Sequence, residues 1–201
     1  MNYAESLTKL LNRLDHQKIS EATREILRTR DNGKCVYVVG SHENSTVANH
    51  FTSQLLLKTQ SKKKCFKAIS LNANSTSISI NAEQYGIESL YSKQLESLAT
   101  RGDLLIAFST TGHCESMIEA VKVAKMKDCT VIVISGTGGG ILKAMSDISI
   151  GLHSEDENDL IVDLHMSIVQ IISNYLKEFC LLETSRPGIT HPNQLNLLEI
   201  Q

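Results

Sequence analysis

Three hydroxyl side chains and a glycine follow an apolar run that we predict to be a strand, and they precede a helical pattern at 115–127. They are Ser109, Thr110, Thr111 and Gly112. The first N–H groups of a helix lack intrahelical partners and the helix dipole adds partial positive charge, so such a turn can bind an anion. Serine and threonine hydroxyls can also donate to phosphate oxygens. The turn predicts a site for a phosphorylated small molecule, with simple helix capping as the alternative.

Another polar turn, 40–45, follows the first predicted strand and precedes another helical pattern. Because it comes earlier in the chain, we call it the first turn, and the turn that begins at Ser109 the second turn. Parallel strands bring their carboxyl ends to one edge of a sheet, so the two turns should face one ligand. Two converging turns favour a phosphosugar site over capping alone. The side chains that we expect to contact the ligand are Ser41, Asn44, Ser45, Ser109, Thr110, Thr111 and Cys114, together with backbone N–H groups between Gly112 and Cys114.

A glycine-rich turn, Gly136-Thr137-Gly138-Gly139-Gly140, follows the fourth predicted strand. A dinucleotide site would need such a turn after the first strand of the unit, and an acidic residue at the end of a following strand. The sequence meets neither condition, and it lacks the G-x-x-x-x-G-K-[ST] motif of nucleoside triphosphate sites. We expect these glycines to allow a tight turn and close helix packing.

The elements that must position these turns alternate between short apolar runs and helical patterns. Near-continuous apolar strands between helices are typical of a parallel sheet that is covered on both faces. The predicted fold class is therefore α/β, a three-layer, doubly wound domain with five parallel strands. We expect strands at 35–40, 66–71, 103–108, 130–134 and 148–150, helices at 5–30, 45–58, 87–100, 115–127, 141–145 and 158–182, and a polar loop at 72–81.

The two ends of the chain have patterns that suit contacts between subunits. We predict one domain over 1–183, in which 1–33 is an oligomerisation helix; packing of this helix over the chain's own sheet is the alternative. Residues 184–201 hold both prolines and little periodicity, so we expect an extended tail or one that drapes over a neighbouring subunit. The apolar stripe of the first helix consists of Leu7, Leu10, Leu11 and Leu14.

The composition limits the classes of function. The chain has 201 residues and a formal net charge of -2, without the basic bias that is typical of nucleic-acid binding. Aromatic residues make up 4% of the chain, which argues against a stacking platform for bases. The five cysteines are widely spaced without a C-x-x-C pair, which fits reduced thiols rather than disulfides or a zinc knuckle. No apolar stretch approaches the ~20 residues of a membrane span and we find no signal peptide, so we expect a cytoplasmic location.

Several stretches, taken in order, resemble the SIS (sugar isomerase) domain over most of the chain. They are similar to the phosphoheptose isomerase branch, which includes a non-enzymatic relative that binds the replication initiator DnaA. The resemblance implies an α/β sandwich, a homotetramer whose first helices form a central bundle, and conversion of sedoheptulose 7-phosphate to a heptose phosphate used in lipopolysaccharide. The stretches are Ala48-Asn49-His50-Phe51, Tyr91-Ser92-Lys93-Gln94, Gly102-Asp103-Leu104-Leu105 with Ser109-Thr110, Ser135-Gly136 with Gly138-Gly139, and Asp163-Leu164-His165-Met166.

The resemblance also implies where catalytic groups should stand, and this chain departs from the family there. Aldose–ketose isomerisation moves a proton between adjacent carbons, so it needs a base and an acid. The family motif H-F-x-x-E supplies the base, but this chain has Gln54 at the glutamate position, and Gln170 stands where a catalytic histidine is expected. Neither amide can take a proton at neutral pH. His42, Glu43 and His113 are the candidates that could replace them.

Two further histidines, His50 and His165, match family motifs, and we expect each to be hydrogen-bonded inside a helix interface rather than catalytic. Some members of the family bind zinc through His, Glu and Gln in the pocket. In this chain Gln54 replaces the glutamate and Val162 replaces an upstream glutamine, so three suitable ligands are hard to assemble. We therefore expect no metal and no other cofactor.

Two functions remain open. One is a non-catalytic protein that binds a sugar phosphate or a protein partner, like the DnaA-binding relative, which also lacks the acid/base pair. Leu71-Asn72 and Tyr91-Ser92-Lys93-Gln94 look closer to that relative. The other is an active sedoheptulose 7-phosphate isomerase with relocated acid and base residues. We favour binding with weak or no isomerase activity, and regulation of a metabolic enzyme is a third hypothesis.

Overall fold

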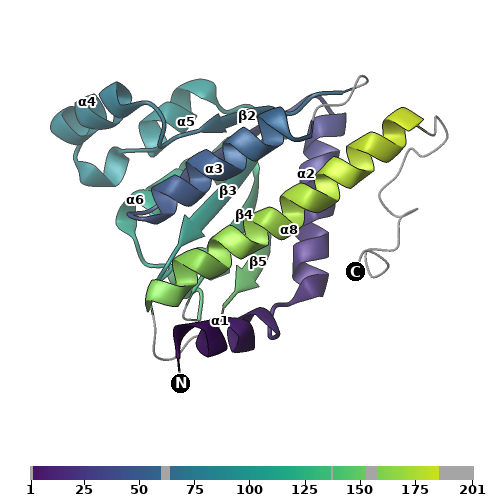
Figure 1. The fold of residues 1–201 in the computed structure, drawn as a ribbon. Helices are drawn as coiled ribbons and strands as arrows, with labels where there is room; N and C mark the ends of the chain where they lie inside the picture. Colours follow the sequence, from purple (N-terminus) through teal and green to yellow (C-terminus); the bar gives the residue numbers. More distant parts are fainter. Residues whose placement is uncertain (1, 60–63, 137, 153–157, 186–201) are drawn as a thin grey trace.

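The computed structural model describes residues 2–59, 64–136, 138–152 and 158–185. A five-stranded parallel sheet has the order β2-β1-β3-β4-β5 (Figure 1). The central strands are almost completely buried because their apolar side chains meet helices on both faces, whereas the edge strand β2 exposes Lys67 and Ile69. The strands are β1 (Cys35–Gly40), β2 (Lys67–Ser70), β3 (Leu104–Ser109), β4 (Thr130–Ser135) and β5 (Ile148–Gly151), which confirms the predicted strands.

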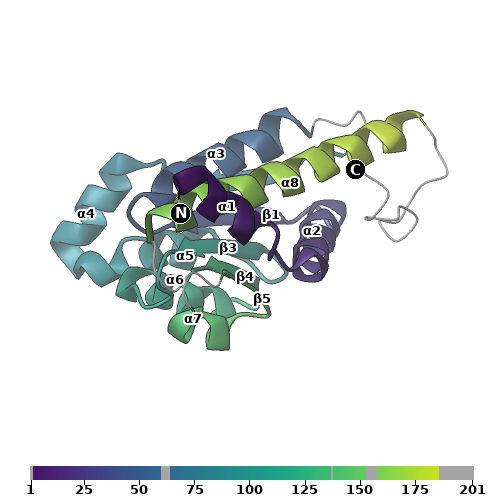
Figure 2. The same ribbon diagram turned by 60° about the horizontal axis from the view of Figure 1, so that its bottom comes forward.

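Helices cover both faces of the sheet and make the three predicted layers (Figure 2). One face packs on α2 (His16–Asp31), α3 (Asn44–Leu57) and α8 (Asn158–Ser185), which share a core with β1, β3 and β4. The other face packs on α5 (Ser92–Leu98), α6 (Glu115–Met126) and α7 (Gly140–Met145). The predicted doubly wound α/β fold is thus confirmed.

The prediction of a single helix at 5–30 is wrong, because the chain forms two helices there. These are α1 (Tyr3–Leu11) and α2, and the carboxylate of Asp15 caps the second by accepting a hydrogen bond from the N–H of Lys18. Leu14 lies between the helices and is buried within the single chain. The other leucines of the stripe, Leu7, Leu10 and Leu11, pack partly against the same core. The stripe therefore packs at least partly on the chain's own core, and its burial between subunits stays a prediction.

The segment after β2 is also different from the prediction. A helix, α4 (Ser75–Tyr85), replaces most of the expected polar loop, and the side chain of Asn74 caps it by accepting from the N–H of Ser77. The helix expected at 87–100 is shorter, because Gly86 has a φ of 87° and a 3-10 turn, η1 (Ile87–Ser89), precedes α5. Tyr91 and Leu95 are buried, whereas Ile87 is 70% exposed.

The last helix, α8, begins where it was predicted and continues to Ser185, beyond the end expected at 182. The rest of the predicted tail, 186–201, lies outside the described residues. Within the part of the chain that the structure describes, none of the helices has the length and apolar character needed to cross a membrane.

Candidate functional site

The two polar turns lie next to each other at the carboxyl edge of the sheet. The strand order reverses between β1 and β3, which are neighbours, and this switch point is where open α/β sheets bind ligands. The N–H of Ser41 donates to the carbonyl of Phe108 at 3.1 Å, and the amide of Asn44 donates to the Thr110 hydroxyl at 3.1 Å. The structure therefore brings the turns together as the topology argument expects.

Side chains of the second turn divide between internal and outward positions. Ser109 is 1% exposed, and its hydroxyl accepts a hydrogen bond from the N–H of Gly112 at 3.0 Å, so it shapes the turn. Thr110 is half-buried and Thr111 is exposed. Cys114 precedes α6 without capping it, and its thiol lies 3.3 Å from the Ser116 hydroxyl. Thr110 and Thr111 are thus the hydroxyls of this turn that an incoming ligand can reach.

The first turn is built around Gly40. A Cβ at this position would lie 2.0 Å from the carbonyl oxygen of Asn44, so only glycine allows this close approach. The Asn72 side chain accepts from the N–H of Gly40 and donates to its carbonyl, both at 2.9 Å, and also donates to the hydroxyl of Tyr91. In the sequence, Asn72 and Tyr91 were noted only because they resemble residues of the DnaA-binding relative, and no structural role was predicted for them. The structure shows that they hold the backbone of this turn.

The glycine-rich turn after β4 packs directly against the second turn, the one that follows β3. A Cβ on Gly112, which has a φ of 72°, would lie 2.1 Å from the carbonyl oxygen of Gly139. A Cβ on Gly136 would lie 2.4 Å from the carbonyl oxygen of Thr110. The N–H of Leu142 in α7 also donates to the carbonyl of Gly112 at 3.1 Å. These contacts confirm that the glycines serve close packing.

Asn44 and His165 form a buried pair beneath the two turns. Both side chains are 0% exposed, and Nδ1 of His165 donates to Oδ1 of Asn44 at 2.6 Å. Burial lowers the pKa of His165 to about 3, so its imidazole is neutral at neutral pH. His165 is thus hydrogen-bonded inside a helix interface, as expected. Asn44 was expected to touch the ligand, but its amide groups bond to His165 and Thr110 behind the turn.

The two glutamines at the family's catalytic positions meet at one imidazole. Nε2 of His50 lies 3.1 Å from the amide nitrogen of Gln54 and 2.8 Å from that of Gln170. Since an amide nitrogen only donates, Nε2 of His50 accepts both hydrogen bonds and the ring proton is on Nδ1. The cluster joins α3 to α8.

The residues present do not fit the zinc ion that the resemblance implies. The Nε2 lone pair of His50, which would bind a metal, is used by two amide donors. Among the described residues no group of three His, Cys, Asp or Glu side chains could hold a metal ion.

The candidates for a relocated acid or base lie on the outer side of the turns. His42 and Glu43 are exposed on the first turn, and His42 has a φ of 51°. His113 is exposed on the second turn, beside Gly140.

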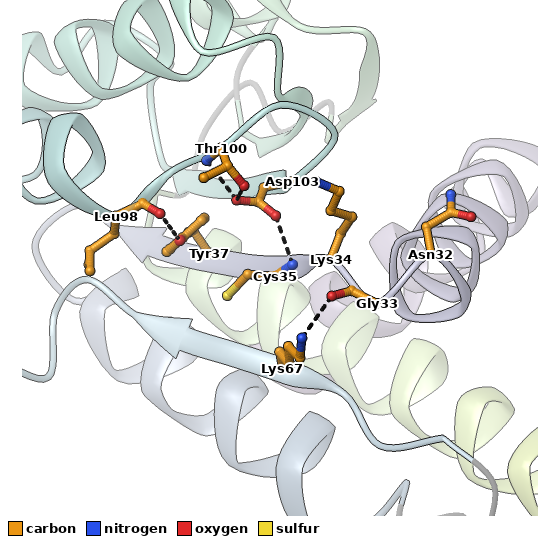
Figure 3. A pocket seen from close by; sticks show the side chains of 9 residues that line it. All are labelled: Asn32, Gly33, Lys34, Cys35, Tyr37, Lys67, Leu98, Thr100 and Asp103. Carbon is orange, nitrogen blue, oxygen red and sulfur yellow. Dashed lines mark hydrogen bonds between the residues drawn. The ribbon is translucent and has the colours of Figure 1, made fainter.

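A shallow pocket of about 420 Å³ lies at the opposite edge of the sheet, near the amino ends of β1 and β3 (Figure 3). Its central carboxylate, Asp103, accepts hydrogen bonds from the N–H groups of Cys35 at 2.9 Å and Thr100 at 2.8 Å. Lys67 donates to the carbonyl of Gly33 at 3.0 Å. These polar groups form hydrogen bonds with one another and with backbone groups near the first residues of the strands. Because the pocket lies at the opposite edge of the sheet, it is separate from the candidate site.

Comparisons with known proteins agree on one family. The SIS domain model matches residues 2–136. A phosphoheptose isomerase of Helicobacter hepaticus is 28% identical over 162 residues, which cover 81% of this chain and 82% of that protein. One of Cytophaga hutchinsonii is 31% identical over 154 residues, which cover 77% of this chain and 80% of that protein. The solved structure of a phosphoheptose isomerase from Francisella tularensis is 27% identical, with a TM-score of 0.79, and covers 88% of this chain and 95% of that chain.

Proposed function

Because this chain belongs to the SIS domain family, in its phosphoheptose isomerase branch, we propose that it binds a phosphorylated sugar with the turns after β1 and β3. The phosphate contacts the hydroxyls of Thr110 and Thr111 and the first N–H groups of α6. A twelve-residue helix at this position supplies unpaired N–H groups and the positive end of its dipole. The sugar lies toward the first turn and the His50 cluster.

The bound sugar is turned over weakly or not at all. The observation that supports this is the pair of amides at His50, where Gln54 and Gln170 both donate to Nε2. Isomerisation needs one group that removes a proton and one that returns it, and each typically contributes ~10²–10⁴-fold. Neither amide can do either, and protonation of Nε2 of His50 would break both hydrogen bonds.

A binding protein without turnover serves a regulatory role, and the resemblance suggests DnaA as its protein partner. Asn72, Tyr91 and Gln94, which are the residues most similar to the DnaA-binding relative, make hydrogen bonds inside this chain. Asn72 and Tyr91 therefore support the shape of the first turn, whereas Gln94 donates to the carbonyl of Leu71 after β2, and a partner surface would use other residues. Direct binding of purified DnaA to the purified chain tests this role.

The alternative is an active sedoheptulose 7-phosphate isomerase in which His42, Glu43 or His113 acts as acid or base. The names of the relatives favour it, since they are phosphoheptose isomerases. The exposed positions of the three side chains on the turns leave them free to reach a sugar.

One assay separates the two functions. The purified chain is titrated with sedoheptulose 7-phosphate by calorimetry, and product formation is measured on the same preparation. We expect saturable binding that is weakened in Thr110→Val, with turnover near background. Robust turnover that is abolished by His42→Ala, Glu43→Ala or His113→Ala would overturn the binding function in favour of the relocated isomerase.

A further inference from the structure

A buried chain of hydrogen bonds leads from α8 to the hydroxyl of Thr110. Nδ1 of His165 is 2.6 Å from Oδ1 of Asn44, and Nδ2 of Asn44 is 3.1 Å from Oγ1 of Thr110. His165 and Asn44 are completely buried, and Thr110 is half-buried at the site. The chain of contacts therefore joins the protein core to one of the hydroxyls that a phosphate can reach.

The direction of each hydrogen bond follows from the chemistry of the groups. An amide oxygen only accepts, so the proton between His165 and Asn44 belongs to Nδ1 of the histidine. Because His165 is neutral, this is its single ring proton, and its Nε2 has no hydrogen-bond partner among the described residues. With Oδ1 committed to His165, the amide N–H of Asn44 must face Thr110. The Thr110 oxygen accepts, which leaves its own proton for another acceptor.

We propose that His165 and Asn44 are positioning residues that hold the Thr110 hydroxyl as a hydrogen-bond donor toward a phosphate. If the Asn44 amide were turned over, its Oδ1 would take the Thr110 proton, and the threonine lone pairs would face the anion. A neutral His165 with its proton on Nδ1 excludes this orientation, since it cannot accept from an amide N–H at that atom. The inference rests on the proposed sugar-phosphate site and adds two residues that need not touch the ligand.

The test is a double-mutant cycle on affinity for sedoheptulose 7-phosphate, measured by calorimetry. A hydrogen bond to a charged group is typically worth a factor of ~10 or more in affinity, so Thr110→Val should weaken binding about 10-fold. His165→Leu should weaken it by a similar factor, because it frees the Asn44 amide to turn. In the Thr110→Val background, His165→Leu should cause no further loss, since the hydroxyl that it orients is absent.

Two matched variants separate positioning from general damage to α8. His165→Asn places an amide N–H close to the position of Nδ1 and should restore most of the affinity. Ser173→Ala removes another completely buried polar group of α8, one without a hydrogen-bond partner among the described residues, and should leave affinity unchanged. Thermal melting of each variant shows whether it folds. In the unmodified protein, ¹⁵N NMR of His165 should show the proton on Nδ1 from pH 5 to 8, which tests the relay without any substitution.

The outcomes distinguish the inference from the proposed function. Absence of binding by the unmodified chain, or unchanged affinity in Thr110→Val, would overturn the proposed site and the inference with it. A site that binds and needs Thr110, but in which His165→Leu binds normally or causes the same loss in both backgrounds, would overturn the inference alone. A proton on Nε2 of His165 would also overturn it.

Discussion

At the scale of single residues, one atom type decides what the His50 cluster can do. The amide nitrogen of Gln54 lies within hydrogen-bond distance of Nε2 of His50, and an amide nitrogen can only donate. A carboxylate at the same position would accept instead, so it would favour a protonated imidazole and could itself take a proton. The amide at Gln54 cannot take a proton, and for this reason the proposed function has weak or no turnover.

Restoring both groups should restore chemistry if the rest of the pocket is suited to it. We predict that Gln54→Glu combined with Gln170→His raises turnover of sedoheptulose 7-phosphate by ~10²-fold or more over the unmodified chain, because an acid and a base are then both present. Each single variant is the control and should give a smaller rise. Equal turnover in the double variant and the unmodified chain would show that other contacts of the pocket had also been lost.

The buried histidine makes stability depend on pH. Burial lowers the pKa of His165 in the folded chain to about 3 from its ordinary value of 6.5, so between these values the unfolded chain binds more protons. The free energy of unfolding should therefore fall as the pH drops below 6.5, by up to ~1.4 kcal/mol per pH unit from this group. Urea unfolding at pH 7 and pH 5 measures this fall in the free energy of unfolding. In His165→Leu the loss between the two pH values should be smaller, and an identical loss would assign the effect to other groups.

Residue-level prediction from the sequence succeeded where a motif marked a position and failed where a contact joins distant segments. The sequence identified Gln54 and Gln170 as departures, but their meeting at His50 joins residues 120 apart in the chain and follows only from the packing of α3 on α8. Asn44 was recognised as part of the site, yet its burial behind Thr110 depends on His165, which no local pattern connects to it.

At the scale of elements, the strands were predictable because each is a short apolar run between turn signals. The errors concern helix boundaries. They occur where a polar side chain caps the start of a helix, or where a glycine ends one. Asp15 divides the first helix in two, and Asn74 starts α4 in a segment whose serines and asparagines are typical of loops. Since α4 has only one buried residue, Asn81, its sequence contains no apolar stripe that would predict a helix.

The ends of α2 and α8 are joined by a buried ion pair that the sequence did not reveal. The guanidinium of Arg30 is completely buried, donates to Glu183 and Asp31 at 2.8 Å each, and lies over the rings of Phe66 and Phe179. A buried charge that loses a charged partner keeps its desolvation cost. This pair should therefore matter more to stability than any exposed pair.

We predict that Glu183→Gln lowers the free energy of unfolding by about 1–3 kcal/mol, measured by urea unfolding at pH 7. Asp31 remains as a second partner of Arg30, which limits the loss. The matched control is Glu119→Gln, which removes one carboxylate of an exposed pair with Lys122 and should cost less than about 1 kcal/mol. Equal effects of the two variants would mean that burial adds nothing to the Arg30 pair.

At the scale of the whole molecule, strand order alone determines where the turns meet. The chain passes from β1 to the edge strand β2 and returns to β3 on the other side of β1, so the turns after β1 and β3 become neighbours. This argument needs only the order of the strands and helices, so the meeting of the two turns could be predicted from the sequence. It could not predict the pocket around Asp103, because that pocket lies at the opposite edge and its polar side chains serve as internal hydrogen-bond partners.

Assembly is a property of the whole molecule, and the resemblance implies it. The outer surfaces of α3 and α8, which lie side by side in Figure 1, expose Leu57 by 70% and Ile171 by 38%. We predict that light scattering of the purified chain at micromolar concentration gives a dimer or a tetramer. Leu57→Glu with Ile171→Glu should shift the mass toward a smaller species, because an unpaired carboxylate buried in an interface is costly. Met126→Glu, at a 74% exposed position on the opposite layer, should leave the mass unchanged. A monomeric unmodified chain would contradict the prediction.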